Sequence, residues 1–219
     1  MGKQINVMQR IAICGALAIA SMSASASTQA SADNDVRAFL GPALTAEVEQ
    51  WDKDFTTAQR EHADALATKG DAQSLLGAVL IYPRWTRLGT PLPATPPKVA
   101  RWFAHARAAA PDDALLAWIE ATACPVPASG CDRPAALERL RALDPGNAAV
   151  WLELMRDAAG RGDDADAGFL FRQAAIAERY DMYLLPLGEL LRASGEGLTA
   201  PAFSADLAAK LQAFSDQTG

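Results

Sequence analysis

Apolar residues recur every three or four positions over most of the chain after residue 45, which is the spacing of one face of a helix. From Thr45 to Thr68 this stripe is formed by Val48, Trp51, Phe55, Ala58, His62 and Leu66. The pattern predicts one long amphipathic helix over 45–68, with Thr45 as its N-cap. No segment shows the alternation of apolar and polar residues that a half-buried strand requires, so the expected fold class is all-α.

Turn residues divide the rest of the chain into further helices. Gly70-Asp71 ends the first helix, and a second is expected over 72–82. The stretch from Pro83 to Pro97 contains five prolines and one glycine, so it is expected to break the helical pattern before helix resumes over 98–109. After Pro111 the apolar pattern indicates helix–turn–helix hairpins.

A period of 34 residues links these helices at three independent positions. The three sets are Pro111, Pro145 and Arg179; Phe103, Leu137 and Phe171; and Ala106, Leu140 and Ala174. A fixed period of this length is typical of repeat proteins, in which one hairpin cannot bury its apolar face alone and therefore stacks on its neighbours.

The hairpin over 144–181 carries the residues that suggest a family. Its first helix has Trp151 and Leu154 on one face, and its second helix is expected to direct Ala167, Phe171 and Ala174 back at the first. This segment resembles a tetratricopeptide repeat, or the related Sel1-like repeat, at the Trp, Leu, Ala and Phe positions. It departs from the tetratricopeptide pattern at three positions, namely Met155, Ala158 and Arg179.

The resemblance implies a short right-handed α-solenoid of three to four hairpins in a domain over 45–219, with the helix over 45–68 as its N-terminal cap. Residues 27–44 are expected to be a flexible or partly ordered lead-in. The expected repeats span about 71–112, 113–146, 147–180 and 181–217. In the second repeat the apolar pair lies at Leu116 and Ile119, whereas the period points to Ala117 and Glu120, so its first helix is expected to be one residue out of register.

The N-terminus has the order of a secretory signal peptide. Lys3 and Arg10 precede a short apolar run, which is followed by small residues up to Ala26, and 1–26 is the expected signal. The apolar run is shorter than the roughly 20 residues of a spanning helix, so no integral membrane segment is expected after cleavage. Lipidation of Cys14 is the alternative, although Cys14 lies early in the run.

Cleavage would change the formal charge from −6 to −8, because Lys3 and Arg10 are lost. An acidic chain is a poor general ligand for nucleic acid, which proteins bind mainly through Lys and Arg, so no nucleic-acid partner is expected. The expected location is the bacterial periplasm or the outside of the cell.

Two cysteines would remain in the exported chain. Cys124 and Cys131 enclose a loop between two expected helices. An oxidising compartment and an even count favour a disulfide, which across so short a loop would contribute about 2–3 kcal/mol. Free thiols or a metal site are the alternatives, and a metal would need two further ligands of matching type.

Candidate chemistry is sparse. His62 lies on the apolar stripe of its helix and is expected to be a satisfied core or interface histidine, and neither histidine belongs to a recognisable catalytic motif. The acidic run that begins at Asp163 lacks the closing carboxylate of a calcium loop, so we expect Asp163 or Asp164 to cap a helix instead. No catalytic residue, metal or cofactor is therefore predicted.

The charge distribution offers one candidate site. Between Asp71 and Asp112 there is no acidic residue, yet the segment carries five positive charges and several aromatic residues. Arginine and aromatic side chains on a proline-stiffened loop are common at interface hot spots. The candidate partner-binding residues here are Arg84, Trp85, Arg87, Lys98, Arg101 and His105. The acidic face of the helix over 45–68 could instead neutralise this segment internally.

A second candidate surface is the concave groove that a tetratricopeptide-like array implies. In the third repeat its exposed side would include Leu152, Arg156 and Ala159, and in the second repeat it would include Ala114, Ala117 and Ala121.

The resemblance implies a non-enzymatic scaffold or adaptor that binds a protein or peptide partner, and the basic segment suggests that this partner is acidic. An inhibitor of a secreted toxin would be a special case. The alternative from a different class is an exported small helical hydrolase acting on cell-envelope polymers, with a carboxylate pair or a Ser/His arrangement assembled in three dimensions. The sequence does not define the oligomeric state.

Overall fold

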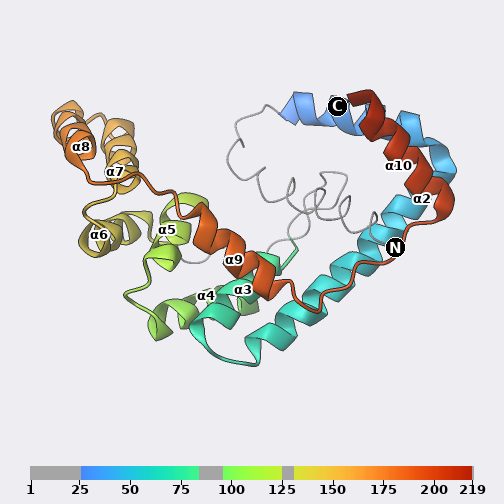
Figure 1. Cartoon of the computed structure of the whole chain (residues 1–219), viewed down its shortest axis with the longest axis horizontal. Helices are drawn as coiled ribbons and strands as arrows, with labels where there is room; N and C mark the ends of the chain where they lie inside the picture. The colour runs from blue at the N-terminus through green and yellow to red at the C-terminus, as the bar shows by residue number, and fades with distance from the viewer. Residues whose placement is uncertain (1–25, 84–95, 125–130, 219) are drawn as a thin grey trace. The chain divides into compact units, whose positions relative to one another are not determined.

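The computed structural model describes residues 26–83, 96–124 and 131–218 (Figure 1). These residues form helices, turns and loops, with one isolated bridge between Asn147 and Arg179, which confirms the all-α class. They belong to two compact units. The terminal unit contains 26–51 and 203–218, and the hairpin unit contains 52–83, 96–124 and 131–202. The expected signal peptide lies almost wholly outside the described residues.

Helix α2 (Ala26–Ala67) begins well before the expected start at Thr45, so most of the expected lead-in is helical. The helix is kinked at Gly41, whose φ of 77° is in the region that glycine adopts most readily, and Pro42 follows. Thr45 is not an N-cap, because it lies inside α2 and its hydroxyl donates to the Gly41 carbonyl over 2.7 Å. The sequence pattern missed the kink because the apolar stripe starts only after it.

The terminal unit joins the first part of α2 to α10 (Ala205–Thr218). Its core is a small cluster formed by Leu40, Val48 and Leu207, and the ring of Phe203 lies 4.9 Å from that of Trp51. The backbone N–H and the hydroxyl of Ser204 both donate to the Glu47 carboxylate over 2.8 Å, which holds the start of α10 against α2.

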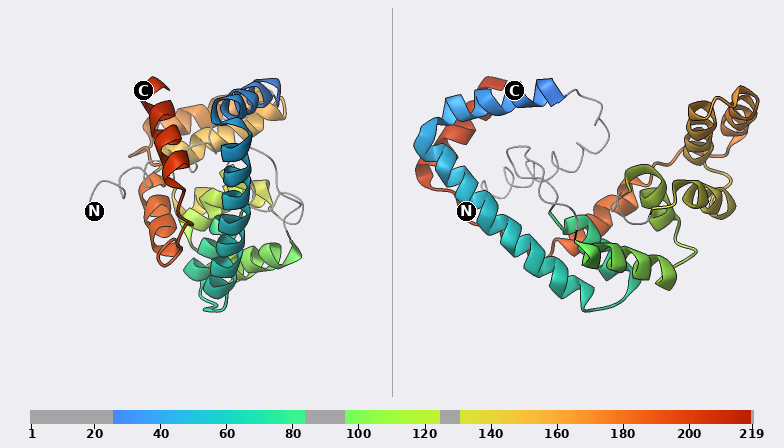
Figure 2. Two further views of the ribbon diagram at one scale, coloured as in Figure 1. Left: turned by 90° about the vertical axis from the view of Figure 1, so that its right-hand side faces the viewer. Right: turned by 180° about the vertical axis from the view of Figure 1, so that it is seen from behind.

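The hairpin unit contains three consecutive helix pairs, and the partners in each pair lie side by side (Figures 1 and 2). The pairs are α3 (Ala72–Ile81) with α4 (Pro97–Ala109), α5 (Ala114–Ala123) with α6 (Arg133–Leu143), and α7 (Ala148–Gly160) with α8 (Asp164–Ile176). Five of these six helices begin at an Asp or Asn whose side chain accepts a backbone N–H of the first turn. These caps are Asp71, Asp113, Asp132, Asn147 and Asp163.

Helix α5 lies between the two hydrophobic clusters of this unit. Leu116 and Ile119 pack in the first cluster with Phe103 of α4, whereas Ala117 belongs to the second cluster with α6 and α7. Both faces of α5 are therefore buried, with Ala117 and Glu120 as well as Leu116 and Ile119 inside, and the register of this helix relative to the period stays a prediction.

Helix α9 (Leu184–Ser194) packs against α3. The contact is close because Gly77 lacks a Cβ, and a Cβ there would lie 2.1 Å from the Ser194 hydroxyl oxygen. His62 Nε2 is hydrogen-bonded to the Ser194 carbonyl over 2.7 Å, so His62 is satisfied, as expected. The fourth repeat expected over 181–217 has its helices α9 and α10 in different compact units, and the repeat boundaries stay a prediction.

Replacing Gly77 with alanine is expected to lower the free energy of unfolding by about 1–3 kcal/mol, because the new methyl group overpacks the contact with Ser194. Gly188→Ala in α9 is the matched control. A Cβ at Gly188 meets nothing within 4 Å, so this change is expected to stabilise by up to about 1 kcal/mol. Urea unfolding of both variants measures the difference, and equal effects would contradict a tight α3–α9 contact.

Candidate functional site

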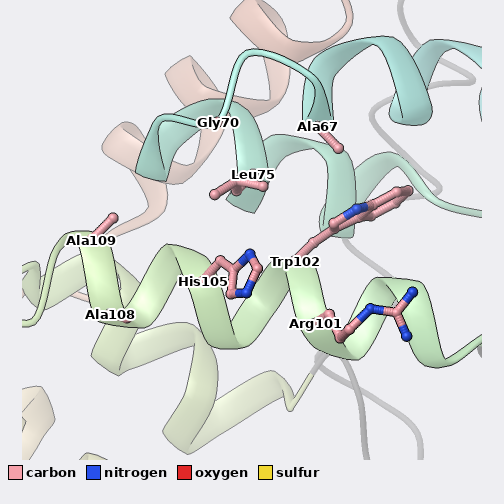
Figure 3. A pocket seen from close by; sticks show the side chains of 8 residues that line it. All are labelled: Ala67, Gly70, Leu75, Arg101, Trp102, His105, Ala108 and Ala109. Atoms are coloured by element: carbon pink, nitrogen blue, oxygen red, sulfur yellow. The ribbon is translucent and has the colours of Figure 1, made fainter.

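A shallow pocket of about 600 Å³ lies between the end of α2, the start of α3 and the outer face of α4 (Figure 3). Its lining residues are Ala67, Gly70, Leu75, Arg101, Trp102, His105, Ala108 and Ala109. The structure therefore brings Arg101 and His105, two of the sequence-predicted binding residues, into one pocket.

Helix α4 presents these side chains because its opposite face is used for the core. Val99, Phe103 and Ala106 are buried against α3 and α5, so positions 101 and 105, one helical turn apart, face outward. Arg101 and His105 are exposed, and half-buried Trp102 meets the Tyr82 ring edge-on with 6.2 Å between centroids. The pocket thus combines a cation, an aromatic face and an imidazole.

Most of the described basic residues in this segment are paired within the hairpin unit. Lys98 Nζ lies 2.7 and 2.8 Å from the two Asp64 carboxylate oxygens, and it also lies over the rings of Trp102 and Tyr82. Arg107 pairs with Glu120 over 2.7 Å. Internal neutralisation therefore accounts for Lys98 and Arg107. Arg101 has no ion pair with any residue in the described part of the chain.

The other predicted binding residues do not join this pocket. Arg84, Trp85 and Arg87 lie outside the described residues. Leu152 and Arg156 belong to α7, where Leu152 is half-buried and exposed Arg156 pairs with Glu153 of the same helix.

The groove expected in the second repeat is wrong at two positions. Ala117 and Ala121 are buried in the second cluster instead of lining an exposed surface. They are small because α5 packs closely on both sides.

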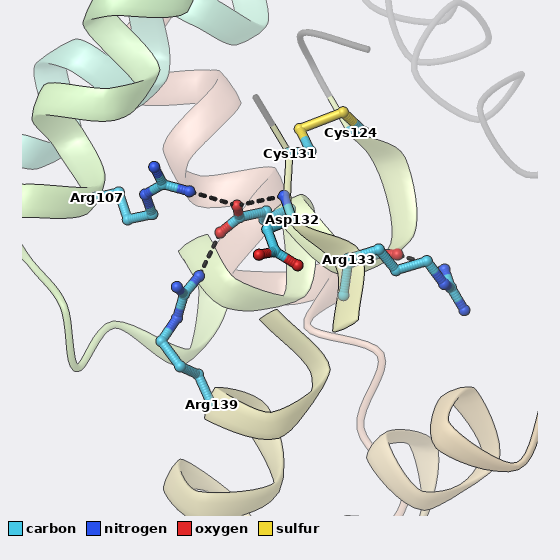
Figure 4. The surroundings of a disulfide bond; sticks show 8 residues. Arg107, Cys124, Cys131, Asp132, Arg133 and Arg139 are labelled. Carbon is cyan, nitrogen blue, oxygen red and sulfur yellow. Dashed lines mark hydrogen bonds and ion pairs between the residues drawn. A yellow bond between two sulfur atoms is a disulfide. The ribbon is translucent and has the colours of Figure 1, made fainter. Parts of the chain in front are cut away.

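The expected disulfide is confirmed, with 5.8 Å between the Cα atoms of Cys124 and Cys131 (Figure 4). It closes the connection between α5 and α6 beside a buried carboxylate, Glu120. Arg107 and Arg139 both donate to this carboxylate, and the backbone N–H of Asp132 donates to it over 3.2 Å (Figure 4). Glu120 therefore ties α4, α6 and the end of the disulfide loop to α5.

The sequence contained a signal for this cluster. Glu120 lies 34 residues before the buried Leu154, so the period placed a charged residue at a core position. A carboxylate at such a position requires cationic partners, because an unpaired buried charge is very costly.

A second polar cluster, also missed from the sequence, surrounds Asp144 at the end of α6. Its buried carboxylate accepts hydrogen bonds from the Tyr183 hydroxyl, from Asn147 Nδ2 over 3.0 Å, and from Arg179. Burial alone would raise the pKa of Asp144, but the hydrogen bonds from Tyr183 and Asn147 and the charge of Arg179 outweigh it and lower that pKa. Burial and the bond to Asp144 raise the pKa of the Tyr183 phenol.

The same cluster fixes the start of α9. Asn147 donates to the Asp181 carbonyl over 2.8 Å and accepts the Asp181 N–H over 2.9 Å. Tyr183 has a φ of 58°, which is rare for an aromatic residue, and its ring packs 5.3 Å from that of Trp118. These contacts stabilise a backbone conformation that would otherwise be unfavourable.

No group of three or more metal-binding side chains occurs within the described ranges, and none of the helices there is long and apolar enough to cross a membrane. No protein-family model, curated protein or solved structure matches the chain. The α4 pocket offers an aromatic surface and the Arg101 guanidinium, which has no ion pair within the described ranges, and its lining residues include no carboxylate, serine or cysteine.

Proposed function

We propose that this chain is an exported, non-enzymatic scaffold that binds an acidic segment of a protein or peptide partner at the α4 pocket. The observation that carries the proposal is the placement of Arg101, Trp102 and His105 around one pocket, whereas Lys98 is paired with Asp64 and Arg107 with Glu120. The 34-residue period and the resemblance to tetratricopeptide repeats support a binding role, since such arrays present surfaces to other proteins.

The pocket suits a carboxylate that has an apolar neighbour. The planar guanidinium of Arg101 can donate two parallel hydrogen bonds to a carboxylate, which is a favoured arrangement in recognition. Trp102 offers apolar contact area beside it, and His105, one turn further along α4, adds a polar contact. Arginine and tryptophan are among the residues that contribute most to binding energy in protein interfaces.

The expected export of the chain is consistent with this proposed function. The signal-like N-terminus favours export, and disulfides such as Cys124–Cys131 persist mainly in oxidising compartments. A partner in the bacterial cell envelope or outside the cell is therefore the one to look for.

Affinity capture from a cell-envelope extract tests the proposal. Arg101→Glu is expected to reduce capture of the partner at least about tenfold, because it replaces attraction to an acidic segment with repulsion. The matched control is Arg141→Glu on α6, which makes the same charge change at an exposed site outside the pocket. The further combination with Arg84→Glu and Arg87→Glu measures the contribution of the preceding loop.

Two results would overturn the proposal. One is capture that Arg101→Glu leaves unchanged, and the other is capture that Arg141→Glu reduces equally, which would indicate dependence on net charge alone. Circular dichroism of each variant checks that helicity is retained.

A further inference from the structure

The exposed large hydrophobic side chains of the described residues are confined to one short segment, 169–185. They lie on α8, on the loop after it and on the first turn of α9, and they include Phe169, Phe171, Ile176, Tyr180, Leu184 and Leu185. Phe169 and Ile176 do not share the side of α8 that carries Phe171, because residues two apart in a helix are separated by about 200° and residues five apart by about 140°. We call Phe171, Leu184 and Leu185 the open face. Exposed apolar residues gathered in one place usually mark an interaction site, whereas scattered ones need no explanation.

The 34-residue period shows what normally covers such a face. Phe103, Leu137 and Phe171 occupy equivalent positions in α4, α6 and α8, and their exposures are 1%, 1% and 58%. In the first two cases the covering residues come from the first helix of the next pair. Phe103 shares a cluster with Leu116 of α5, and Leu137 shares a cluster with Val150 of α7.

The residues that cover Phe103 and Leu137 follow the same 34-residue period. Leu116, Val150 and Leu184 are 34 residues apart, and their exposures are 2%, 0% and 60%. By the same period, Phe171 on α8 and Leu184 on α9 are the two residues that would meet at a third junction between helix pairs. Both are exposed, so the hairpin unit carries the apolar residue and the residue that would cover it, and neither is covered.

Contacts at both ends of α9 prevent it from covering Phe171 of the same chain. At its start, Tyr183 is fixed by its hydrogen bond to Asp144 and its contact with Trp118. At its end, Ser194 packs on Gly77 and its carbonyl bonds to His62. Leu187 and Leu190 between them pack against the first cluster. Covering Phe171 with the same chain's α9 would break these contacts.

We propose that a second copy of this chain covers the open face, so that α8 of each protomer contacts the first turn of α9 of its partner. The contact is reciprocal, because each copy supplies both halves, and it is therefore compatible with a closed two-fold dimer. Leu184 and Leu185 of one protomer take the place next to Phe171 that α5 and α7 residues take at the two earlier junctions.

Sedimentation equilibrium of the mature, oxidised chain over about 1–200 µM tests the proposal directly. The wild-type chain is expected to show the mass of two chains at the upper end of this range. Phe171→Glu and Leu185→Lys are each expected to raise the dissociation constant at least about tenfold, because each places a charge in an apolar contact. Both residues are exposed within one chain, so neither change should impair folding.

The matched control is Ala142→Glu, which adds a charge at an exposed position of α6 outside the open face and is expected to leave the dissociation constant unchanged. Mixing Phe171→Glu with Leu185→Lys tests the pairing of α8 with α9. In the mixed dimer one junction keeps the native residues, and the other places the introduced carboxylate opposite the introduced ammonium group. Mixing is therefore expected to restore association.

A wild-type chain that stays monomeric over the whole range would overturn the proposal. So would a dimer that both single variants leave intact, and a dimer that each variant disrupts but mixing does not restore, since that result would place like elements opposite each other. None of these outcomes depends on the α4 pocket, so the dimer and the proposed partner site are tested separately.

Discussion

The variant Arg107→Ala/Arg139→Ala is expected to lower the free energy of unfolding by about 3–5 kcal/mol, because it leaves the fully buried Glu120 carboxylate without a cationic partner. Of the donors among the described residues, the Asp132 N–H, at 3.2 Å, would remain. In a chain of this size the loss corresponds to a fall in Tm on the order of 10 °C.

Removing the carboxylate itself is expected to cost far less. The side chains of Arg107 and Arg139 are each about one-third exposed, so they can turn to water once Glu120 is gone. The 34-residue period matches this position to the buried Leu154 of the next pair, so leucine is the replacement tested. We expect Glu120→Leu to change stability by no more than about 1.5 kcal/mol and to recover at least half of the loss when added to the double variant.

Urea unfolding followed by circular dichroism compares the four proteins, provided that the slope of each transition is the same. The decisive quantity is the difference between the double variant and the triple variant. A triple variant less stable than the double one would contradict the argument, because it would mean that Glu120 stabilises the fold even without its arginines.

The helices and their pairing could be predicted from the sequence because they depend on local signals. The apolar spacing located α3 and α4 to within about one residue, the cap expected at Asp163 or Asp164 marked the start of α8, and the disulfide followed from two cysteines in a chain with a signal-like N-terminus. The family resemblance stays a prediction, since the structure confirms the helix pairs and not the repeat family.

Tertiary contacts decided the features that were missed. The pattern of the third repeat assigned Phe171 to the interior of its hairpin, but Leu170 is buried and Phe171 is 58% exposed. Apolar residues occur on several sides of α8, so its pattern does not reveal which side the neighbouring helix covers. Likewise, the sequence located Arg101 and Lys98 in one basic segment, but only the structure shows that Lys98 is paired with Asp64, whereas Arg101 has no ion pair in the part of the chain that the structure describes.

Replacing Asp144 with alanine is expected to lower the free energy of unfolding by about 2–4 kcal/mol. The buried Tyr183 hydroxyl loses its hydrogen-bond acceptor, and the Asn147 side-chain amide loses one of its two acceptors. Arg179 is half exposed and can be hydrated instead. Tyr183→Phe removes one donor and is expected to cost about 1–2 kcal/mol. The matched control is Tyr180→Phe, at a tyrosine that is 61% exposed, where the change should stay within about 0.5 kcal/mol. Urea unfolding at pH 7 measures all three.

The pH dependence of stability separates the contribution of the Asp144 charge from that of its shape. Because folding lowers the pKa of Asp144, its carboxylate contributes stability above the ordinary value of 3.8, and this contribution is lost as the pH falls through the folded-state pKa. Asp144→Asn keeps the shape without the charge, so its deficit relative to the wild type should shrink between pH 7 and about pH 2. A deficit that stays constant over this range would show that the carboxylate's charge adds nothing.

At the alkaline end the sign is reversed, because folding raises the pKa of Tyr183. A phenol whose folded-state pKa is raised contributes stability below the ordinary value of 10.0 and loses it as the pH rises further. The stability difference between the wild type and Tyr183→Phe should therefore decrease above pH 10. The hydrogen bond from Tyr183 to Asp144 therefore contributes to opposite pH responses at the two ends of the range, together with the burial of Tyr183 and the contacts of Asp144 with Asn147 and Arg179. If Asp144→Asn or Tyr183→Phe changed the pH dependence of stability at only one end of the range, the two side chains would act independently.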